Sequence, residues 1–287
     1  MNFDKLLENM KASINYEELD LRQLLNEIET QLLVKGLVDN IGHNHSLVRE
    51  NILGLLYYRL IAENFLSHEE CISVLDTCLS DSHLFKGIGS KGDDSVFFRS
   101  FSSLVIAGIL ETDEERSILS QDQYMLALDK AIEYMRQEVD RRGFVVGKGW
   151  AHAAAHGADM LCALVHHPRF DMKFAGDVLE CVKCHIASRD GFVDLDEKRL
   201  AKVIPILMSK GLSELDVKNW ICSLLPSLAS VIHTDEYYQD VRILMNIEYF
   251  LMALYFIAGE DPAYEGLGRY ILEFVPTMRK RSFIEAS

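Results

Sequence analysis

The sequence predicts an all-α protein, and two observations carry that prediction. Apolar residues recur at three- and four-residue spacing through nearly the whole chain, whereas the alternating pattern of strands is missing. Helix start and stop signals divide the chain into about eleven helices, paired at intervals of about 40 to 55 residues. That spacing is typical of stacked helical hairpins, as in a HEAT-like α-α superhelix (an α solenoid) or a compact toroid of paired helices.

Helix starts are visible as N-cap residues. Ser67 precedes Glu70 by three positions, and Ser120 precedes Gln123 in the same way, so both pairs fit capping boxes. Three further residues are N-cap candidates by residue type: Asp171, Ser213 and Thr234.

Helix ends are expected at glycines and prolines that follow an apolar-periodic stretch. They are Gly36, Gly143, Gly211, Gly259, Pro168 and Pro262. Pro205 lies instead inside a helical pattern, residues 195–208, where it predicts a kink or a break between two short helices.

The composition predicts one soluble domain spanning residues 1–287. Hydrophobic residues make up 49% and charged residues 25%, which suffices for a large core, and no Pro-, Gly- or Ser-rich linker divides the chain. The formal net charge of −15 repels phosphate backbones and anionic lipids, so we expect neither nucleic acid nor a membrane as a partner. The basic cluster at residues 279–281 has the composition of a solvated tail.

The chain is expected in the cytoplasm. Residues 1–13 carry acidic side chains and lack the apolar core of a signal peptide. The most apolar runs, residues 100–110 and 249–258, are shorter than the roughly 20 residues that cross a bilayer. Without export, the six cysteines are expected to be reduced thiols.

Residues 181–185, CVKCH, spell the pattern by which c-type haem is attached. The pattern lies inside an amphipathic helical run, residues 172–187, so we interpret Cys181 and Cys184 as small helical residues and expect no haem. Zinc at these cysteines requires a second ligand pair, and the sequence offers only the histidines of the segment described next.

The segment GKGWAHAAAHGAD, residues 147–159, carries the main candidate site. If residues 150–166 form one helix, His152, His156 and Asp159 fall within about 60° of one another. Trp150 then lies on the opposite, buried face. The flanks of the polar stripe carry alanine and cysteine rather than Lys, Glu or Arg, so we expect the stripe to open into a crevice or the core.

A second helical run, residues 95–110, carries a charge of the opposite sign. Arg99 is its only charged residue, and it forms a stripe with Ser95 and Ser102 at i, i+4 and i+7. Because a buried carboxylate without a partner is costly, we predict that Arg99 and Asp159 face the same crevice, paired directly or through a ligand.

Four explanations of the stripe compete: a structural hydrogen-bond network, which is the simplest, a nonmetal ligand or catalytic site, a metal site, and a solvated face. For metal, His152 and His156 have the i, i+4 spacing of zinc-binding helices and Asp159 completes three ligands. Ala153, however, occupies the position of the glutamate in H-E-x-x-H. For nucleophilic catalysis no nucleophile elbow is present; the serines available are Ser100, Ser102 and Ser103.

Four segments resemble, in the same order, the recurring segments of a bacterial family known as a domain of unknown function: GDDSVFFRSFSSLVIAGIL, GWAHAAAHGADML, EKRLAKVI and NIEYFLMALYF. They span roughly residues 51–257, and the Trp-x-His-x-x-x-His-x-x-Asp segment is the most specific. The resemblance implies motif positions at Arg99, Ser100, Ser102, Trp150, His152, His156, Gly157, Asp159, Arg199, Asn246 and Tyr255. It implies no particular activity, cofactor or substrate.

We therefore expect a helical scaffold or binding protein whose crevice takes a small ligand or peptide. The ligand-binding candidates are Arg99, Ser102, Trp150, His152, His156 and Asp159, of which His152, His156 and Asp159 are also the candidate metal ligands. The alternative is a hydrolase, metal-dependent or acid–base, that uses the same crevice, and a third hypothesis is a pH-sensitive switch at the histidines. No cofactor is predicted, with zinc or another divalent metal as the alternative.

Overall fold

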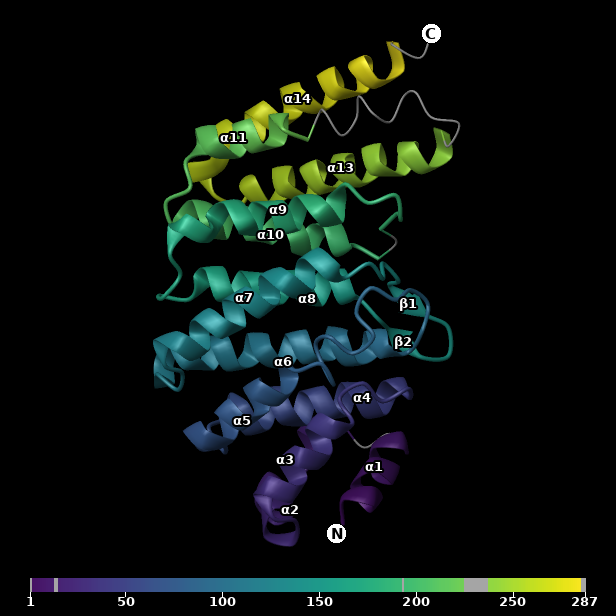
Figure 1. Cartoon of the computed structure of the whole chain (residues 1–287), viewed down its shortest axis with the longest axis vertical. Helices are drawn as coiled ribbons and strands as arrows, with labels where there is room; N and C mark the ends of the chain where they lie inside the picture. Colours follow the sequence, from purple (N-terminus) through teal and green to yellow (C-terminus); the bar gives the residue numbers. More distant parts are fainter. Residues whose placement is uncertain (1, 13–14, 193, 225–236, 285–287) are drawn as a thin grey trace. The chain divides into compact units, whose positions relative to one another are not determined.

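The prediction of an all-α protein is confirmed. The structure is a computed structural model that describes residues 2–12, 15–192, 194–224 and 237–284, and these residues form thirteen α-helices, near the predicted number of about eleven (Figure 1). The chain divides into two compact units, Met1–Arg169 and Phe170–Ser287, which are described separately below. The prediction of a single domain stays a prediction.

Unit 1 carries the helices that surround the predicted site, together with one short hairpin. Its elements are α1 (Phe3–Lys11), η1 (Tyr16–Glu18), α2 (Leu21–Glu27), α3 (Thr30–Asp39), α4 (Ser46–Leu53), η2 (Gly54–Ile61), α5 (His68–Cys78), α6 (Ser95–Arg116), α7 (Gln121–Gln137), β1 (Phe144–Val145), β2 (Gly149–Trp150) and α8 (Ala153–His166).

The two central helices of unit 1, α6 and α8, run parallel to each other. Near their starts, Ser100 Oγ lies 2.7 Å from His156 Nδ1, and near their ends, Asp113 Oδ2 lies 2.9 Å from His167 Nε2. α6 is apolar and nearly free of charge over residues 95–110, as a helix between other helices must be. The helix α7 lies between them in the sequence, so the chain runs back through α7 before α8 begins parallel to α6.

The segment formed by α4 and η2 lies along α6 in the same direction. The guanidinium of Arg49 lies 4.0 Å from the ring centre of Phe97, and eight residues later Tyr57 donates a hydrogen bond to Glu111. η2 is a π-helix, in which Ala62 N donates to Tyr57 O at 3.0 Å across five residues. Three parallel helices joined through α5 and α7 are the arrangement expected of stacked hairpins; solenoid and toroid remain alternatives.

Most of the predicted helix starts and ends coincide with helix ends in the structure. The capping boxes at Ser67 and Ser120 are confirmed, and so are the N-caps at Asp171 and Ser213. Thr234 lies outside the described residues. Three predicted stops directly follow helices, Gly211, Gly259 and Pro168, whereas Pro262 begins a short 3-10 helix, η4 (Pro262–Tyr264), just after the end of a helix.

Two predicted stops are wrong. Gly36 lies inside α3, where a Cβ would come within 2.7 Å of the Phe3 ring, so this glycine permits close packing rather than ending a helix. α7 ends at Gln137, well before Gly143, because Glu138 leaves the helix in an extended conformation and its carboxylate accepts from Arg99.

Unit 2 is built from five described α-helices and two short 3-10 helices. They are η3 (Met172–Phe174), α9 (Ala175–Ile186), α10 (Asp196–Ser209), α11 (Glu214–Cys222), α13 (Tyr237–Ala258), η4 (Pro262–Tyr264) and α14 (Glu265–Ile284). α10 packs on α13, and α13 packs on α14. α10 continues through Pro205 as one helix, so the predicted break is absent there.

Two sequence features of unit 2 have structural roles. Cys181 is buried and Cys184 is exposed on α9, so the two thiols of CVKCH face different environments. Asn246 on α13 holds the segment after α9, because its amide donates to Ser188 O at 3.0 Å and to Asp190 O at 3.1 Å. Asn246 thus hydrogen-bonds the chain near the end of a neighbouring helix.

Two described helices are long and apolar enough to cross a bilayer by length and composition: α6 and residues 241–258 of α13. Most of α6 is buried inside unit 1, as in the core helix of a water-soluble fold. The helices thus extend beyond the apolar runs seen in the sequence. The prediction of a soluble protein stays a prediction.

Two histidines of unit 1 are buried in hydrogen-bonded positions. His83 Nε2 lies 3.0 Å from Val38 O, and His167 Nε2 lies 2.9 Å from the Asp113 carboxylate. Burial lowers the pKa of both imidazoles, and for His167 it outweighs the opposing effect of Asp113. Both side chains therefore resist protonation in the folded state.

We expect the free energy of unfolding to fall as the pH drops below about 6.5, the ordinary histidine pKa, because the unfolded chain then binds protons that the folded chain does not. Above that pH both states are neutral and the contribution is fully present. In urea denaturation, His83→Gln and His167→Gln should each reduce the loss of stability between pH 7.5 and 5.5. His68→Gln, at an exposed position, is the control; equal pH slopes in all three variants and the wild type would contradict the prediction.

Candidate functional site

The helix that carries the predicted stripe begins at Ala153, three residues later than expected. Trp150 lies in β2, pairs with Phe144 of β1, and is 41% exposed rather than buried. His152 has a left-handed backbone with φ of 47°, which is costly for a residue other than glycine. The hairpin imposes this turn, because His152 N donates to Arg142 O at 3.1 Å before the chain enters α8.

The rings of Trp150, His152 and His156 form a contiguous series that we call the aromatic ladder. The indole of Trp150 stacks on His152 with centroids 4.6 Å apart, and the imidazoles of His152 and His156 are 5.7 Å apart. Phe144 meets the indole at 5.1 Å, and Phe101 meets His156 at 5.4 Å, both edge to face. The ladder therefore leads from the exposed hairpin to the nearly buried first turn of α8.

Ser100 determines which nitrogen of His156 carries the proton. The Ser100 hydroxyl donates to Ala151 O, and its oxygen lies 2.7 Å from His156 Nδ1. Because a hydroxyl has one proton, Nδ1–H donates to Ser100 Oγ, and the lone pair of His156 is on Nε2. Ser100 is completely buried, so it positions His156 and is not placed as a nucleophile.

Glu50 extends the site from α4. Its carboxyl makes no hydrogen bond or ion pair with the residues that the structure describes. The side chain is exposed, yet the surrounding protein raises the pKa of the carboxyl by desolvation, against the opposing charges of Arg49 and His152.

Asp159 lies one helical turn beyond His156, half-buried and beside Tyr57 of η2. Burial and the hydrogen bond to Glu111 raise the pKa of the Tyr57 hydroxyl, and the charge of Asp159 adds to that effect. His156 and Asp159 are thus three residues apart on α8, and His152 is its N-cap residue; the charge of His152 acts on Glu50, and the charge of Asp159 acts on Tyr57.

Arg49 holds the hairpin against α4 and α6. It is completely buried and donates to Lys148 O at 2.5 Å, Trp150 O at 3.3 Å and His43 O at 2.7 Å. Its guanidinium also lies over the Phe97 ring. Burial lowers the pKa of Arg49 to about 10. Backbone carbonyls, rather than a carboxylate, thus accept the hydrogen bonds of this cation.

The partner of Arg99 is Glu138, so the predicted direct pair with Asp159 is wrong. Arg99 donates to the Glu138 carboxylate at 2.6 and 3.1 Å, and both side chains are fully buried. Ser102 lies beside Cys78 of α5. Successive residues of a helix point about 100° apart, so of this group only Ser100 faces α8; Arg99 and Ser102 lie away from the ladder.

The predicted metal ligands do not form a ready site. Among the described residues, no three His, Cys, Asp or Glu side chains are arranged to hold a metal ion. His152 and His156 are neighbours in the ladder, and Asp159 is one turn further along α8. A metal at these residues stays a prediction.

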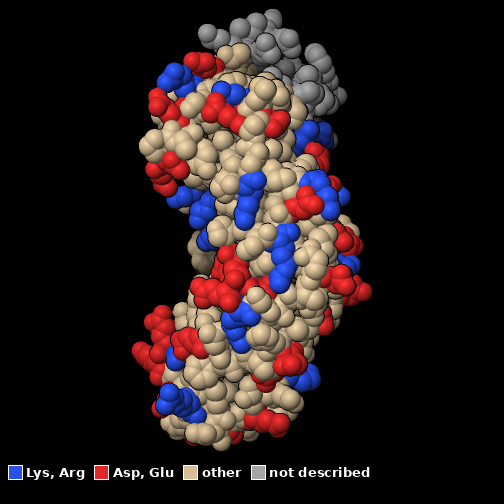
Figure 2. Space-filling model, turned by 90° about the vertical axis from the view of Figure 1, so that its left-hand side faces the viewer, with Lys and Arg blue, Asp and Glu red and all other residues tan. Residues whose placement is uncertain are grey.

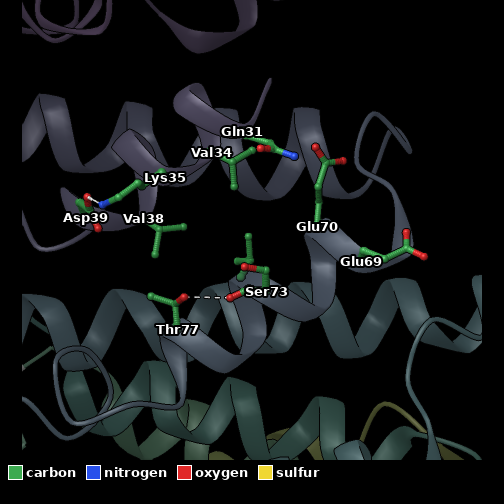
Figure 3. A pocket seen from close by; sticks show the side chains of 10 residues that line it. Gln31, Val34, Lys35, Val38, Asp39, Glu69, Glu70, Ser73 and Thr77 are labelled. Carbon is green, nitrogen blue, oxygen red and sulfur yellow. Dashed lines mark hydrogen bonds and ion pairs between the residues drawn. The ribbon is translucent and has the colours of Figure 1, made fainter. Parts of the chain in front are cut away.

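A groove of 560 Å³ lies elsewhere in unit 1, between α3 and α5 (Figure 3). It contains none of the residues predicted from the sequence. On the face drawn in Figure 2, lysine and arginine side chains are scattered among carboxylates and form no continuous basic surface. The aromatic ladder and the groove are therefore separate candidate sites.

The described part of the chain is thus predominantly α-helical, and the aromatic ladder is its candidate site. The family model for a protein of unknown function (DUF2785) matches residues 84–256, and the chain belongs to this family. The family prediction is confirmed, although the match begins later than residue 51. The match includes Ser100 and the whole ladder but not Glu50. No curated protein and no solved structure matches the chain.

Proposed function

We propose that this chain is a binding protein and that its ligand lies along the aromatic ladder between Glu50 and Asp159. The observation that carries the proposal is the geometry of the ladder: the indole of Trp150 is 41% exposed and stacks on His152. Glu50 of α4 is also exposed and makes no hydrogen bond or ion pair with the described residues, so a ligand can contact both an aromatic face and a carboxylate.

The other groups of the ladder supply recognition elements of different kinds. The exposed indole of Trp150 offers a flat apolar face, and His156 presents Nε2 as a hydrogen-bond acceptor. The strained backbone of His152 is the kind of cost that persists at binding sites. A small ligand or peptide fits this combination, on a helical scaffold that we place in the cytoplasm.

A hydrolase is the second candidate function, and the His156 tautomer favours it. An imidazole with Nδ1–H fixed by a hydroxyl and Nε2 as the basic nitrogen is oriented for general base catalysis. The same nitrogen is a suitable metal ligand, with His152 and Asp159 nearby. Metal analysis of purified protein tests the metal version: stoichiometric zinc or another divalent metal, lost in His152→Gln, would support it.

The binding proposal predicts that Trp150 reports ligand occupancy. The chain has two tryptophans, so in a Trp220→Phe background the fluorescence comes from Trp150 alone. A screen of small polar ligands and peptides should find compounds that change this emission, and Glu50→Gln and His156→Gln should each weaken their binding by about tenfold, as loss of a hydrogen bond to a charged group does.

His68→Gln and Glu115→Gln serve as matched controls, because both residues are exposed and belong to neither candidate site. Both should bind like the parent. A ligand that binds Glu50→Gln, His156→Gln and the controls with the same affinity binds elsewhere. If every ligand found in the screen behaves in this way, the proposal is overturned.

A further inference from the structure

The groove between α3 and α5 is a second site, distinct from the ladder. It lies in residues 31–77, outside the segment matched by the family model. Figure 3 shows Gln31 near Glu70 at one end and Asp39 near Thr77 at the other, so the two helices that form its walls run parallel. Its 560 Å³ is within the range of small-molecule sites.

The middle of the groove is apolar and its ends are charged. Val34, Val38 and Val74 form the floor, and each is buried. Glu69 and Glu70 stand at one end, and the pair Lys35 and Asp39 stands at the other (Figure 3). A ligand that fits this pattern has an aliphatic centre and charged ends.

The charged side chains at the two ends of the groove differ in the hydrogen bonds and ion pairs that they make. Glu69 is exposed and makes no hydrogen bond or ion pair with the described residues, while Glu70 accepts from Ser67 N in its capping box. Asp39 pairs with Lys35 on the same helix, with exposed fractions of 48% and 71%. Such an exposed i, i+4 pair contributes only a few tenths of a kcal/mol, so a stronger cation can replace Lys35.

We propose that this groove binds a linear aliphatic diamine with an amine at each end. One terminal ammonium group pairs with Glu69 and Glu70, the methylene chain lies over the three valines, and the other terminal ammonium group pairs with Asp39 after Lys35 swings away. The proposal rests on charge complementarity: the groove has three carboxylates and one lysine among its lining residues, which leaves an excess of negative charge.

The length of the groove selects among amines. Gln31 and Asp39 are eight residues apart on α3, which corresponds to about 12 Å along the helix axis. 1,8-Diaminooctane is long enough to reach both ends and has no internal charge over the valines, whereas 1,4-diaminobutane reaches from one end to the middle and butylamine carries a single charge. Affinity should therefore fall in that order, because the shorter amines satisfy one end only.

Equilibrium dialysis of the whole chain with labelled 1,8-diaminooctane tests the proposal. Glu69→Gln should weaken binding about threefold to fivefold, and Lys35→Gln should tighten it by a similar factor, since it removes both a competitor and a like charge. Raising the salt concentration to about 1 M should weaken binding in the wild type, because exposed charges are then screened.

Asp122→Asn is the matched control for Glu69→Gln. Asp122 occupies the same position in α7, which also begins with a capping box, so the two variants lose the same charge at equivalent places. The affinity for 1,8-diaminooctane should be unchanged in Asp122→Asn. Equal weakening in both variants, or butylamine binding as tightly as 1,8-diaminooctane, would show that amines merely associate with an acidic chain and would overturn the proposal.

Discussion

Replacing Arg99 by methionine should lower the free energy of unfolding by about 3 to 5 kcal/mol, because it leaves the buried Glu138 carboxylate without its cation. Arg99 also donates to Lys86 O at 2.8 Å, so the variant loses a bond that fixes the loop before α6. For a chain of this size the melting temperature should fall by roughly 10 °C. Thermal and urea unfolding followed by circular dichroism measure both quantities.

Two further variants separate the charge from the side-chain volume. Arg22→Met changes an exposed arginine on α2 and should alter the stability by less than about 0.5 kcal/mol. Arg99→Met combined with Glu138→Leu removes both charges and should recover part of the loss. A double variant as unstable as the sum of the two single variants would show that the pair is not the source of the effect.

Replacing Arg49 by methionine should release the hairpin from α4 and α6. The variant loses hydrogen bonds to three carbonyls and the contact with Phe97, so we expect a loss of about 3 kcal/mol or more. The Trp150 emission, measured in the Trp220→Phe background, should shift to longer wavelength as the indole leaves its stack with His152. Arg49→Lys should not restore it, because a lysine lacks the planar fork.

Lys148→Met is the control for the hairpin. It removes the partly exposed ion pair with Asp94 but leaves the carbonyl of residue 148 in place for Arg49. The Trp150 emission should therefore remain that of the parent. If Arg49→Met keeps the parent emission as well, the hairpin is held by other contacts and Arg49 has no positioning role.

The sequence sufficed to predict the helices because their signals are local. The capping boxes at Ser67 and Ser120 involve residues three positions apart, and apolar spacing depends on the helix itself. The start of α8 was misplaced, because its first residues belong to a hairpin that is set by a distant arginine. No sequence pattern reports that Arg49 contacts residues about one hundred positions away.

The partners within the site were the least predictable part. Arg99 and Asp159 are each the only charged residue in an apolar helical run. That shared property does not show that the two side chains are in contact. The true partner of Arg99, Glu138, sits among ordinary charged residues at the end of α7. Glu50 was missed for the same reason, because a glutamate in an amphipathic helix is usually solvated. Only the packing of α4 against the hairpin distinguishes it.

The π-helical segment η2 has a consequence for how this site can change between related chains. A π-helix accommodates a surplus residue relative to the α-helical register, so deleting one residue within Gly54–Ile61 converts it to an ordinary helix. Because the wider π-helical turn absorbs that residue, its deletion leaves the flanking helical backbone in register and changes only which side chain occupies each position of the segment. Loss of a single codon can thus change the side chains that η2 presents, without altering any residue of α8.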